Sequence, residues 1–157
     1  MAPHASASFV LDPRLKSDCI YIDDLALCRV LLMDDAQYPW LILVPRIANI
    51  SEIHQLNTNK QQQLICESSA LSKAMARRFG PDKMNIANLG NIVSQLHLHL
   101  VARFKNDPAW PGPVWGHAES IPYTQIQREN RQQLVQELVS EAKGSILSGD
   151  QVSYQRY

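Results

Sequence analysis

The sequence predicts one α+β domain, in which an antiparallel sheet of about five strands packs with two main helices. Short aliphatic runs separated by turn residues stand on both sides of one long amphipathic segment, and a second amphipathic segment follows them. Strands that are grouped together with few helices are typical of an α+β fold with an antiparallel sheet. The length of 157 residues suits a single domain (1–157), whose core buries roughly 70% of the surface that the unfolded chain exposes.

Three strands are expected in the first third of the chain, at residues 19–22, 27–33 and 40–44. Each is a short run rich in aliphatic residues, and at that length such a run favours a strand over a helix. Aspartate pairs and prolines separate the runs. We therefore expect an antiparallel meander with short connections.

A long helix is expected to begin at Thr58 and to end at Gly80 and Pro81. Residues 58–61 have the pattern of a capping box, in which the threonine hydroxyl and the glutamine amide bond to free backbone N–H groups. Apolar residues then recur at helical spacing and form one face. A second capping box, at residues 124–127, predicts the start of the other main helix.

Two further strands are expected between the helices, at residues 84–89 and 96–104. A loop rich in proline and tryptophan follows at residues 107–116. The small, polar start (residues 1–8) and the tail (residues 148–157) are expected to be mobile.

The charge balance excludes several classes of protein. Lysine and arginine total 15, as do aspartate and glutamate, so the formal net charge is zero. An extended nucleic-acid-binding surface needs a basic excess, which is missing here. No apolar run approaches the roughly 18 residues of a membrane span, and no signal peptide is visible. We therefore expect no membrane and no extended nucleic acid among the partners.

The three cysteines, Cys19, Cys28 and Cys66, are odd in number and widely spaced. They match no zinc or redox spacing. We interpret them as buried, reduced thiols, which are typical of a cytoplasmic protein.

The chemistry is concentrated in residues 95–101. Because strand side chains alternate in direction, Gln95, His97 and His99 are expected on one face, with Arg103 further along it. Leucines occupy the other face and anchor it in the core. Three interpretations stay open: a half-exposed strand with a polar face, a metal site, and nucleophilic catalysis by an imidazole. The metal site would need a third ligand, and no candidate stands at a spacing that is diagnostic of one.

Residues 95–101 resemble the signature of the histidine triad (HIT) superfamily, three histidines separated by apolar residues, with Gln95 in the place of the first histidine. Residues 40–46 resemble the strand of that family that ends in proline followed by lysine or arginine. Residues 108–116 look like those of a bacterial subgroup described as diadenosine tetraphosphate hydrolase-like. The resemblance implies the HIT fold and a homodimer in which two sheets join.

The resemblance also implies a nucleotide hydrolase or nucleotidyl transferase, acting on a nucleoside phosphoramidate or a dinucleoside polyphosphate, with a purine nucleoside as the expected substrate part. In this scheme His97 attacks the α-phosphorus and forms a nucleotidyl-histidine, while His99 contacts the phosphate and orients His97. No metal and no cofactor is required. Gln95 and Trp40 stand where the family has histidines, so we expect weak activity, because neither side chain acts as an acid near neutral pH.

Two alternatives remain beside the enzyme: a nucleotide-binding protein of this fold with little or no catalysis, and a metal-binding domain that uses His97 and His99.

We expect other residues to bind the nucleotide as well. By resemblance, Asn88, Gly90 and Asn91 would hold phosphate, although the same residues suit a turn.

By the same resemblance Asp34 would bind the ribose hydroxyls, with Asp35 as an equal contender and a turn as the simpler interpretation. Arg103 would hold phosphate, unless it is a surface cation. Trp110 and Trp115 either pack over the sheet or stack on a base.

Overall fold

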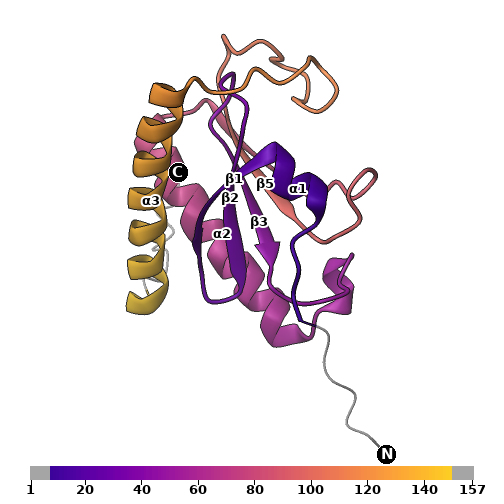
Figure 1. Cartoon of the computed structure of the whole chain (residues 1–157). Coiled ribbons are helices and arrows are strands. Elements are labelled where there is room, and N and C mark those ends of the chain that lie inside the picture. The colour runs from indigo at the N-terminus through magenta and orange to yellow at the C-terminus, as the bar shows by residue number, and fades with distance from the viewer. Residues whose placement is uncertain (1–7, 150–157) are drawn as a thin grey trace, which may run out of the picture.

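The computed structural model describes residues 8–149 and contains a five-stranded antiparallel sheet with three α-helices, two of them long (Figure 1). The strand order across the sheet is β1-β2-β3-β5-β4, and every neighbouring pair is antiparallel. The strands are β1 (Cys19–Asp24), β2 (Cys28–Met33), β3 (Trp40–Pro45), β4 (Lys83–Ala87) and β5 (Leu98–Arg103). The predicted α+β class is therefore confirmed.

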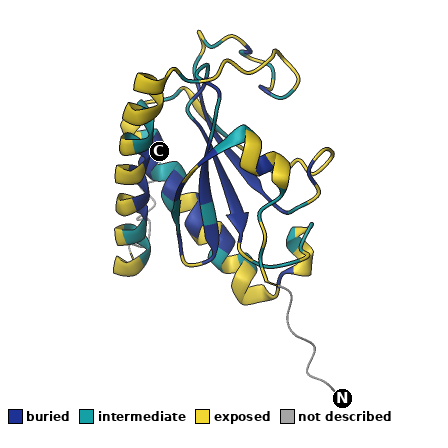
Figure 2. Cartoon of the chain, in the orientation of Figure 1, coloured by how far each residue is buried: buried dark blue, intermediate teal, exposed yellow. Residues whose placement is uncertain are grey.

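Helices α2 (Thr58–Phe79) and α3 (Gln125–Ser148) cover one face of this sheet. They pack against each other, and α2 lies against β5 while α3 lies against β1 and β2. Figure 2 shows the strands as largely buried and the outer sides of both helices as exposed. The larger apolar core lies between these two layers, as the amphipathic patterns predict.

The ends of both long helices follow from local capping. The predicted capping box begins α3, where the Thr124 hydroxyl accepts from the backbone N–H of Gln127. The predicted cap of α2 is wrong by one residue, because Asn57 accepts from the N–H of Lys60 and Thr58 is the first helical residue. Asparagine and threonine both cap helices well, so adjacent candidates leave the start ambiguous. Gly80, with φ of 58°, ends α2 in the left-handed conformation that glycine adopts without strain.

Several boundaries differ from the sequence prediction. The structure adds a short helix, α1 (Pro13–Asp18), and a 3₁₀ turn, η1 (Ile53–Gln55), and it starts β5 two residues later than expected. Ser148, expected in a mobile tail, ends α3. Gly149, also expected in that tail, is the C-cap of α3, and Ser8 is exposed. The other residues expected to be mobile, 1–7 and 150–157, lie outside the described residues.

The second face of the sheet is covered by α1 and by the loop that follows β5, and Figure 1 shows α1 in front of the strands. A smaller apolar cluster fills this side. It includes Leu15 of α1, Trp40 and Ile42 of β3, Val101 of β5 and Val114 of the loop. Because both faces are covered, β3 and β5 are buried along their whole length.

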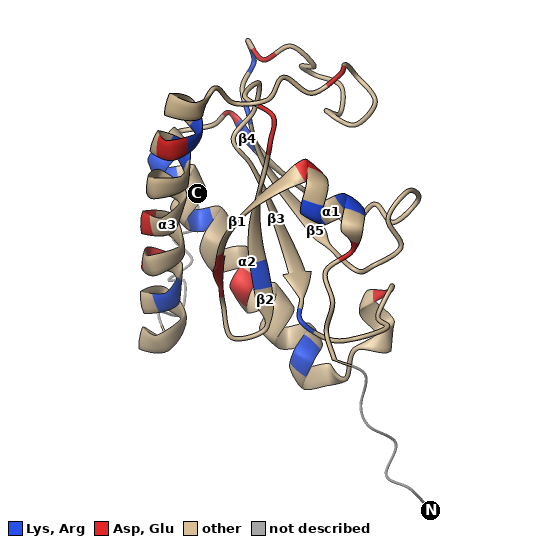
Figure 3. Ribbon diagram, viewed as in Figure 1, with Lys and Arg blue, Asp and Glu red and all other residues tan. Residues whose placement is uncertain are grey.

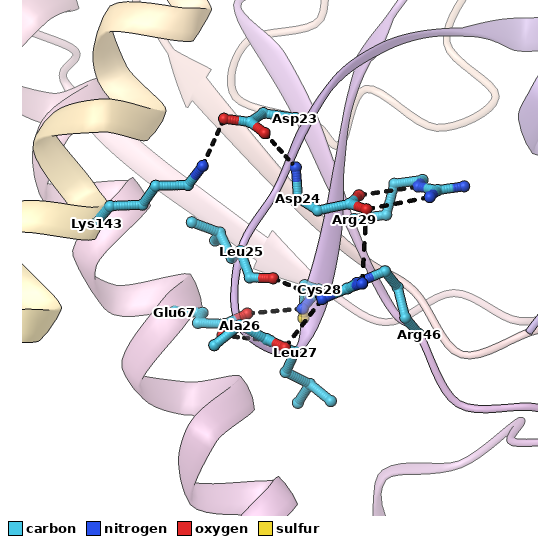
Figure 4. Close-up of polar contacts among 10 residues, drawn as sticks. All are labelled: Asp23, Asp24, Leu25, Ala26, Leu27, Cys28, Arg29, Arg46, Glu67 and Lys143. Atoms are coloured by element: carbon cyan, nitrogen blue, oxygen red, sulfur yellow. Dashed lines mark hydrogen bonds and ion pairs between the residues drawn. The ribbon is translucent and has the colours of Figure 1, made fainter.

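The β1–β2 hairpin is fixed to the rest of the fold by two charged side chains, one buried and one exposed (Figure 4). The Glu67 carboxylate, fully buried on α2, accepts from the backbone N–H groups of Leu27 and Cys28 at 2.7 and 2.9 Å. Arg46, directly after β3, donates to the carbonyls of Leu25 and Ala26. The arginine that ends the block of residues 40–46 therefore has a structural role in this chain.

The three cysteines are free, but the expectation that all are buried is wrong. Cys28 is buried and Cys19 half-buried, whereas Cys66 lies on a solvent-facing side of α2. Among the helices of residues 8–149, none is both long enough and apolar enough to cross a membrane.

Candidate active site

His97, directly before β5, and His99, the second residue of β5, lie side by side. Their ring centroids are 4.8 Å apart, with the ring planes at 71°. Both side chains lie on the face covered by α1, while Leu98 and Leu100 belong to the core on the helical face. His97 is 3% exposed and His99 7% exposed. The interpretation of a half-exposed strand with a wet polar face is therefore wrong.

The hydrogen bond of His97 defines which of its nitrogens is free. Its Nδ1 lies 2.6 Å from the backbone carbonyl oxygen of Gln95. A carbonyl only accepts, so Nδ1 must carry the hydrogen, and the Nε2 of the neutral ring keeps its lone pair. Such an Nε2 has the form that a nucleophile requires.

His99 has the opposite tautomer. The indole N–H of Trp40 donates to Nδ1 of His99 at 3.0 Å, and an indole nitrogen cannot accept. The hydrogen of neutral His99 is therefore on Nε2. Burial and the neighbouring His97 lower the pKa of His99 to about 3, so the ring stays neutral at neutral pH.

A cavity of about 420 Å³ opens beside the two histidines. This volume is in the range of small-molecule sites. Most of its wall is apolar and comes from α1, the central strands and the segment before β5: Leu15, Met33, Ile42, Leu89, Ile92 and Val93. A separate cavity of about 480 Å³, between residues 8–13 and residues 48–51, is lined by Gln95 but by no histidine.

Two tryptophans complete the cavity. Trp115, from the loop after β5, packs edge-on against His99 and Trp40, with centroid distances of 5.3 and 5.9 Å. Its indole nitrogen is buried and has no hydrogen-bond partner among the described residues. Trp110 instead lies over Arg103, at 5.9 Å. The sequence left the roles of Trp110 and Trp115 open, and of these two only Trp115 lines the cavity, together with Trp40 of β3.

Gln95 does not direct its side chain into this cavity, contrary to the expectation from strand alternation. The chain bends at Gln95 and the strand begins only at Leu98. The Gln95 amide accepts from the backbone N–H of Asp12 and donates to the carbonyl of Val10, both at 2.9 Å. Its side chain therefore anchors the N-terminal segment, and only its backbone carbonyl contacts a histidine.

Arg103 is likewise not placed to hold a ligand. Its side chain is 2% exposed and pairs with the Asp107 carboxylate at 2.7 Å. It also donates to Asn85 and to the carbonyl of Gly112, both at 2.8 Å. The prediction of a phosphate contact or a surface cation is wrong, because the loop folds back and surrounds the guanidinium.

The acidic candidates after β2 also form hydrogen bonds within the protein, to backbone N–H groups. Asp34 accepts from the N–H of Tyr123, and buried Asp35 accepts from the N–H of Gln37. Neither lines the cavity. The acidic residue that does so is Asp18, at the end of α1. No sequence pattern pointed to Asp18, because a six-residue helix is too short to show periodicity.

Of the three phosphate candidates before β5, Asn91 lines the cavity. Asn88 and Gly90 lie on the same exposed segment but not in the cavity wall. Within residues 8–149, no group of three or more His, Cys, Asp or Glu side chains is arranged to hold a metal ion. The metal interpretation of His97 and His99 therefore lacks the third ligand that it needs.

Comparison with known proteins shows to which family the fold and the sequence are similar. The family model of the HIT domain matches residues 13–106. A histidine triad protein from Marinobacter aquaeolei VT8 is 48% identical, with a TM-score of 0.85, and the match covers 87% of this chain and 99% of that one. A histidine triad protein from Bradyrhizobium japonicum is 42% identical, with a TM-score of 0.82 and coverage of 85% and 99%. A search of curated proteins gives no match.

Proposed function

The chain belongs to the HIT domain family, and on that premise we propose that it is a nucleotide hydrolase or nucleotidyl transferase with His97 as the nucleophile. Members of this family typically act on nucleotides. The observation that carries the proposal is the bond from His97 Nδ1 to the Gln95 carbonyl, which makes Nε2 the nitrogen that holds the lone pair in the neutral ring of this cavity residue.

The reaction has two steps in this proposal. The lone pair of His97 Nε2 forms a bond to the α-phosphorus, while the bond from phosphorus to the leaving nitrogen or oxygen breaks. The leaving group keeps that electron pair and takes a proton from water. Water then attacks the phosphorus, the nitrogen–phosphorus bond breaks, its electron pair returns to Nε2, and the proton goes to solvent. A covalent intermediate of this kind replaces one difficult displacement with two easier ones.

The other groups have supporting roles. The Nε2–H of His99 would donate to a phosphate oxygen, since Trp40 holds the other nitrogen as an acceptor. Asn91 would donate to the same phosphate from the exposed segment. The apolar wall would bury the base, with Trp115 at its edge. The substrates that we propose are nucleoside phosphoramidates and dinucleoside polyphosphates.

The test is to incubate the protein with adenosine 5′-phosphoramidate and to measure intact mass and released AMP. We expect an adenylylated chain in rapidly quenched wild type and AMP release only at the uncatalysed rate in His97→Gln. The matched control is His54→Gln, since His54 is exposed on η1 and outside the cavity. An adduct that persists in His97→Gln would overturn the assignment of the nucleophile.

A second candidate is a nucleotide-binding protein with little or no catalysis. It is favoured by the direction of two side chains: Gln95 points to the N-terminal segment and Trp40 donates to His99, so neither would assist proton transfer to a leaving group. Titration calorimetry with AMP separates the two functions. Binding without adduct and without AMP release would support the second one.

We further propose a cytoplasmic homodimer. Strand β4 forms one edge of the sheet, and an edge strand offers unpaired backbone groups to a second copy. Light scattering at several concentrations tests this, and a monomer at all of them would contradict it.

A further inference from the structure

Helix α1 forms a wall of the candidate active site. Its buried Leu15 packs into the same apolar cluster as Trp40. Arg14 and Asp18 stand four positions apart, one turn of the helix, and both line the cavity. In Figure 1, α1 lies in front of the strands that carry the histidines.

Both ends of α1 are fixed. At its start, Gln95 bonds to the N–H of Asp12, and the Asp12 carboxylate caps the helix by accepting from the N–H of Arg14 at 2.8 Å. At its end, the carbonyl of Asp18 accepts from the N–H of Asp34 at 3.1 Å. A helix held in this way keeps Arg14 at the cavity and lowers the entropy cost of binding there.

Arg14 is the one lysine or arginine that lines this cavity in the part of the chain that the structure describes. Its Nε pairs with the Asp18 carboxylate at 3.3 Å, which orients the guanidinium. Its two Nη groups make no hydrogen bond with the described residues, and the side chain is 61% exposed. Figure 3 shows basic and acidic positions on α1, while the strands behind it are mostly uncharged.

We propose that Arg14 selects substrates whose leaving group carries a negative charge close to the reactive phosphorus. The site presents two imidazoles to the α-phosphate and one arginine on a separate wall, so a second anionic group is what Arg14 would recognise. A planar guanidinium matches both a carboxylate and a phosphate. The proposal rests on the function proposed above, because it assigns the leaving group of that same reaction.

The first test uses two substrates that differ by one charge, the adenosine 5′-phosphoramidates of alanine and of alaninamide. Wild type should prefer the carboxylate in kcat/KM by about five- to tenfold, the effect of a charge-assisted contact that is partly exposed. Arg14→Gln should reduce the preference to about one, and Arg14→Lys should restore part of it. Lys16→Gln is the matched control, since Lys16 has the same charge on α1 but does not line the cavity.

A second pair distinguishes the source of the anion. Diadenosine tetraphosphate offers further phosphates, and unsubstituted adenosine 5′-phosphoramidate offers none. If Arg14→Gln lowers kcat/KM for the tetraphosphate but not for the alanine derivative, the group that Arg14 prefers is a phosphate. If it lowers kcat/KM for the alanine derivative but not for the tetraphosphate, that group is a carboxylate. Either preference should weaken as salt is raised.

The failures of the two proposals differ. If Arg14→Gln keeps the wild-type preference for both pairs while His97→Gln is inactive, the inference about Arg14 is wrong and the proposed function stands. If wild type turns over none of these substrates, dissociation constants for the alanine pair give the same comparison. Equal affinities in wild type and Arg14→Gln would then overturn the inference.

Discussion

The buried, neutral state of His99 should make the protein sensitive to acid in a way that the His99→Gln variant is not. In the folded chain the pKa of His99 is lowered to about 3, by burial first and by His97 second. In the unfolded chain an imidazole has its ordinary pKa of about 6.5. Between these values the unfolded state takes up the proton and the folded state does not, so stability falls as the pH falls.

The size of the effect follows from the two pKa values. The contribution is fully present above pH 6.5 and is lost progressively toward pH 3. One pKa unit corresponds to about 1.4 kcal/mol, so the 1.5 units between pH 6.5 and pH 5 cost about 2 kcal/mol. Glutamine cannot titrate, yet its carbonyl still offers Trp40 an acceptor, which makes His99→Gln the appropriate comparison.

The assay is urea unfolding, followed by tryptophan fluorescence, at pH 8 and pH 5 for both proteins. The free energy of unfolding of wild type should fall between these pH values by about 2 kcal/mol more than that of the variant. Equal losses of unfolding free energy in wild type and variant would refute the reasoning, because they would mean that His99 binds its proton equally well in the folded and the unfolded state.

Three further outcomes are expected. Glu67→Ala leaves two buried hairpin N–H groups without an acceptor, so it should lower the free energy of unfolding, measured by urea denaturation, by about 2–4 kcal/mol. Glu67→Gln keeps an acceptor and should lose less, and equal stability of wild type and both variants would contradict this. Gln95→Leu should release the N-terminal segment, raise KM and speed trypsin cleavage within α1, and an unchanged cleavage rate would argue against the anchor. Iodoacetamide at pH 8 should label exposed Cys66 in the native protein but not Cys19 or Cys28. Burial raises the pKa of the Cys28 thiol and raises that of Cys19 to about 12, so both stay protonated at that pH. Peptide masses that show equal labelling of the three cysteines would oppose this.

Most of the fold could be predicted because its signals are local. Aliphatic runs bounded by turn residues located all five strands, and apolar spacing with caps located both long helices. Helix α1 was missed because six residues do not complete two turns of an amphipathic pattern. The cap of α2 was misplaced because Asn57 and Thr58 are both good caps.

The site was predicted only as far as strand alternation reaches. His97 and His99 are two residues apart near a strand start, so their shared face follows from the sequence. The direction of the Gln95 side chain does not follow from the sequence, because its hydrogen-bond partners Val10 and Asp12 are more than 80 positions away in the chain. The burial of Arg103 likewise depends on how the following loop folds back over it.

The central claim, that Nε2 of His97 faces the α-phosphorus of a bound nucleotide, is tested most directly by a crystal structure with AMP. The claim predicts phosphorus about 3–3.5 Å from Nε2, a near-attack distance, with a phosphate oxygen bonded to His99 and the base against the apolar wall. A nucleotide bound elsewhere, or one whose phosphate lies beyond reach of Nε2, would contradict it.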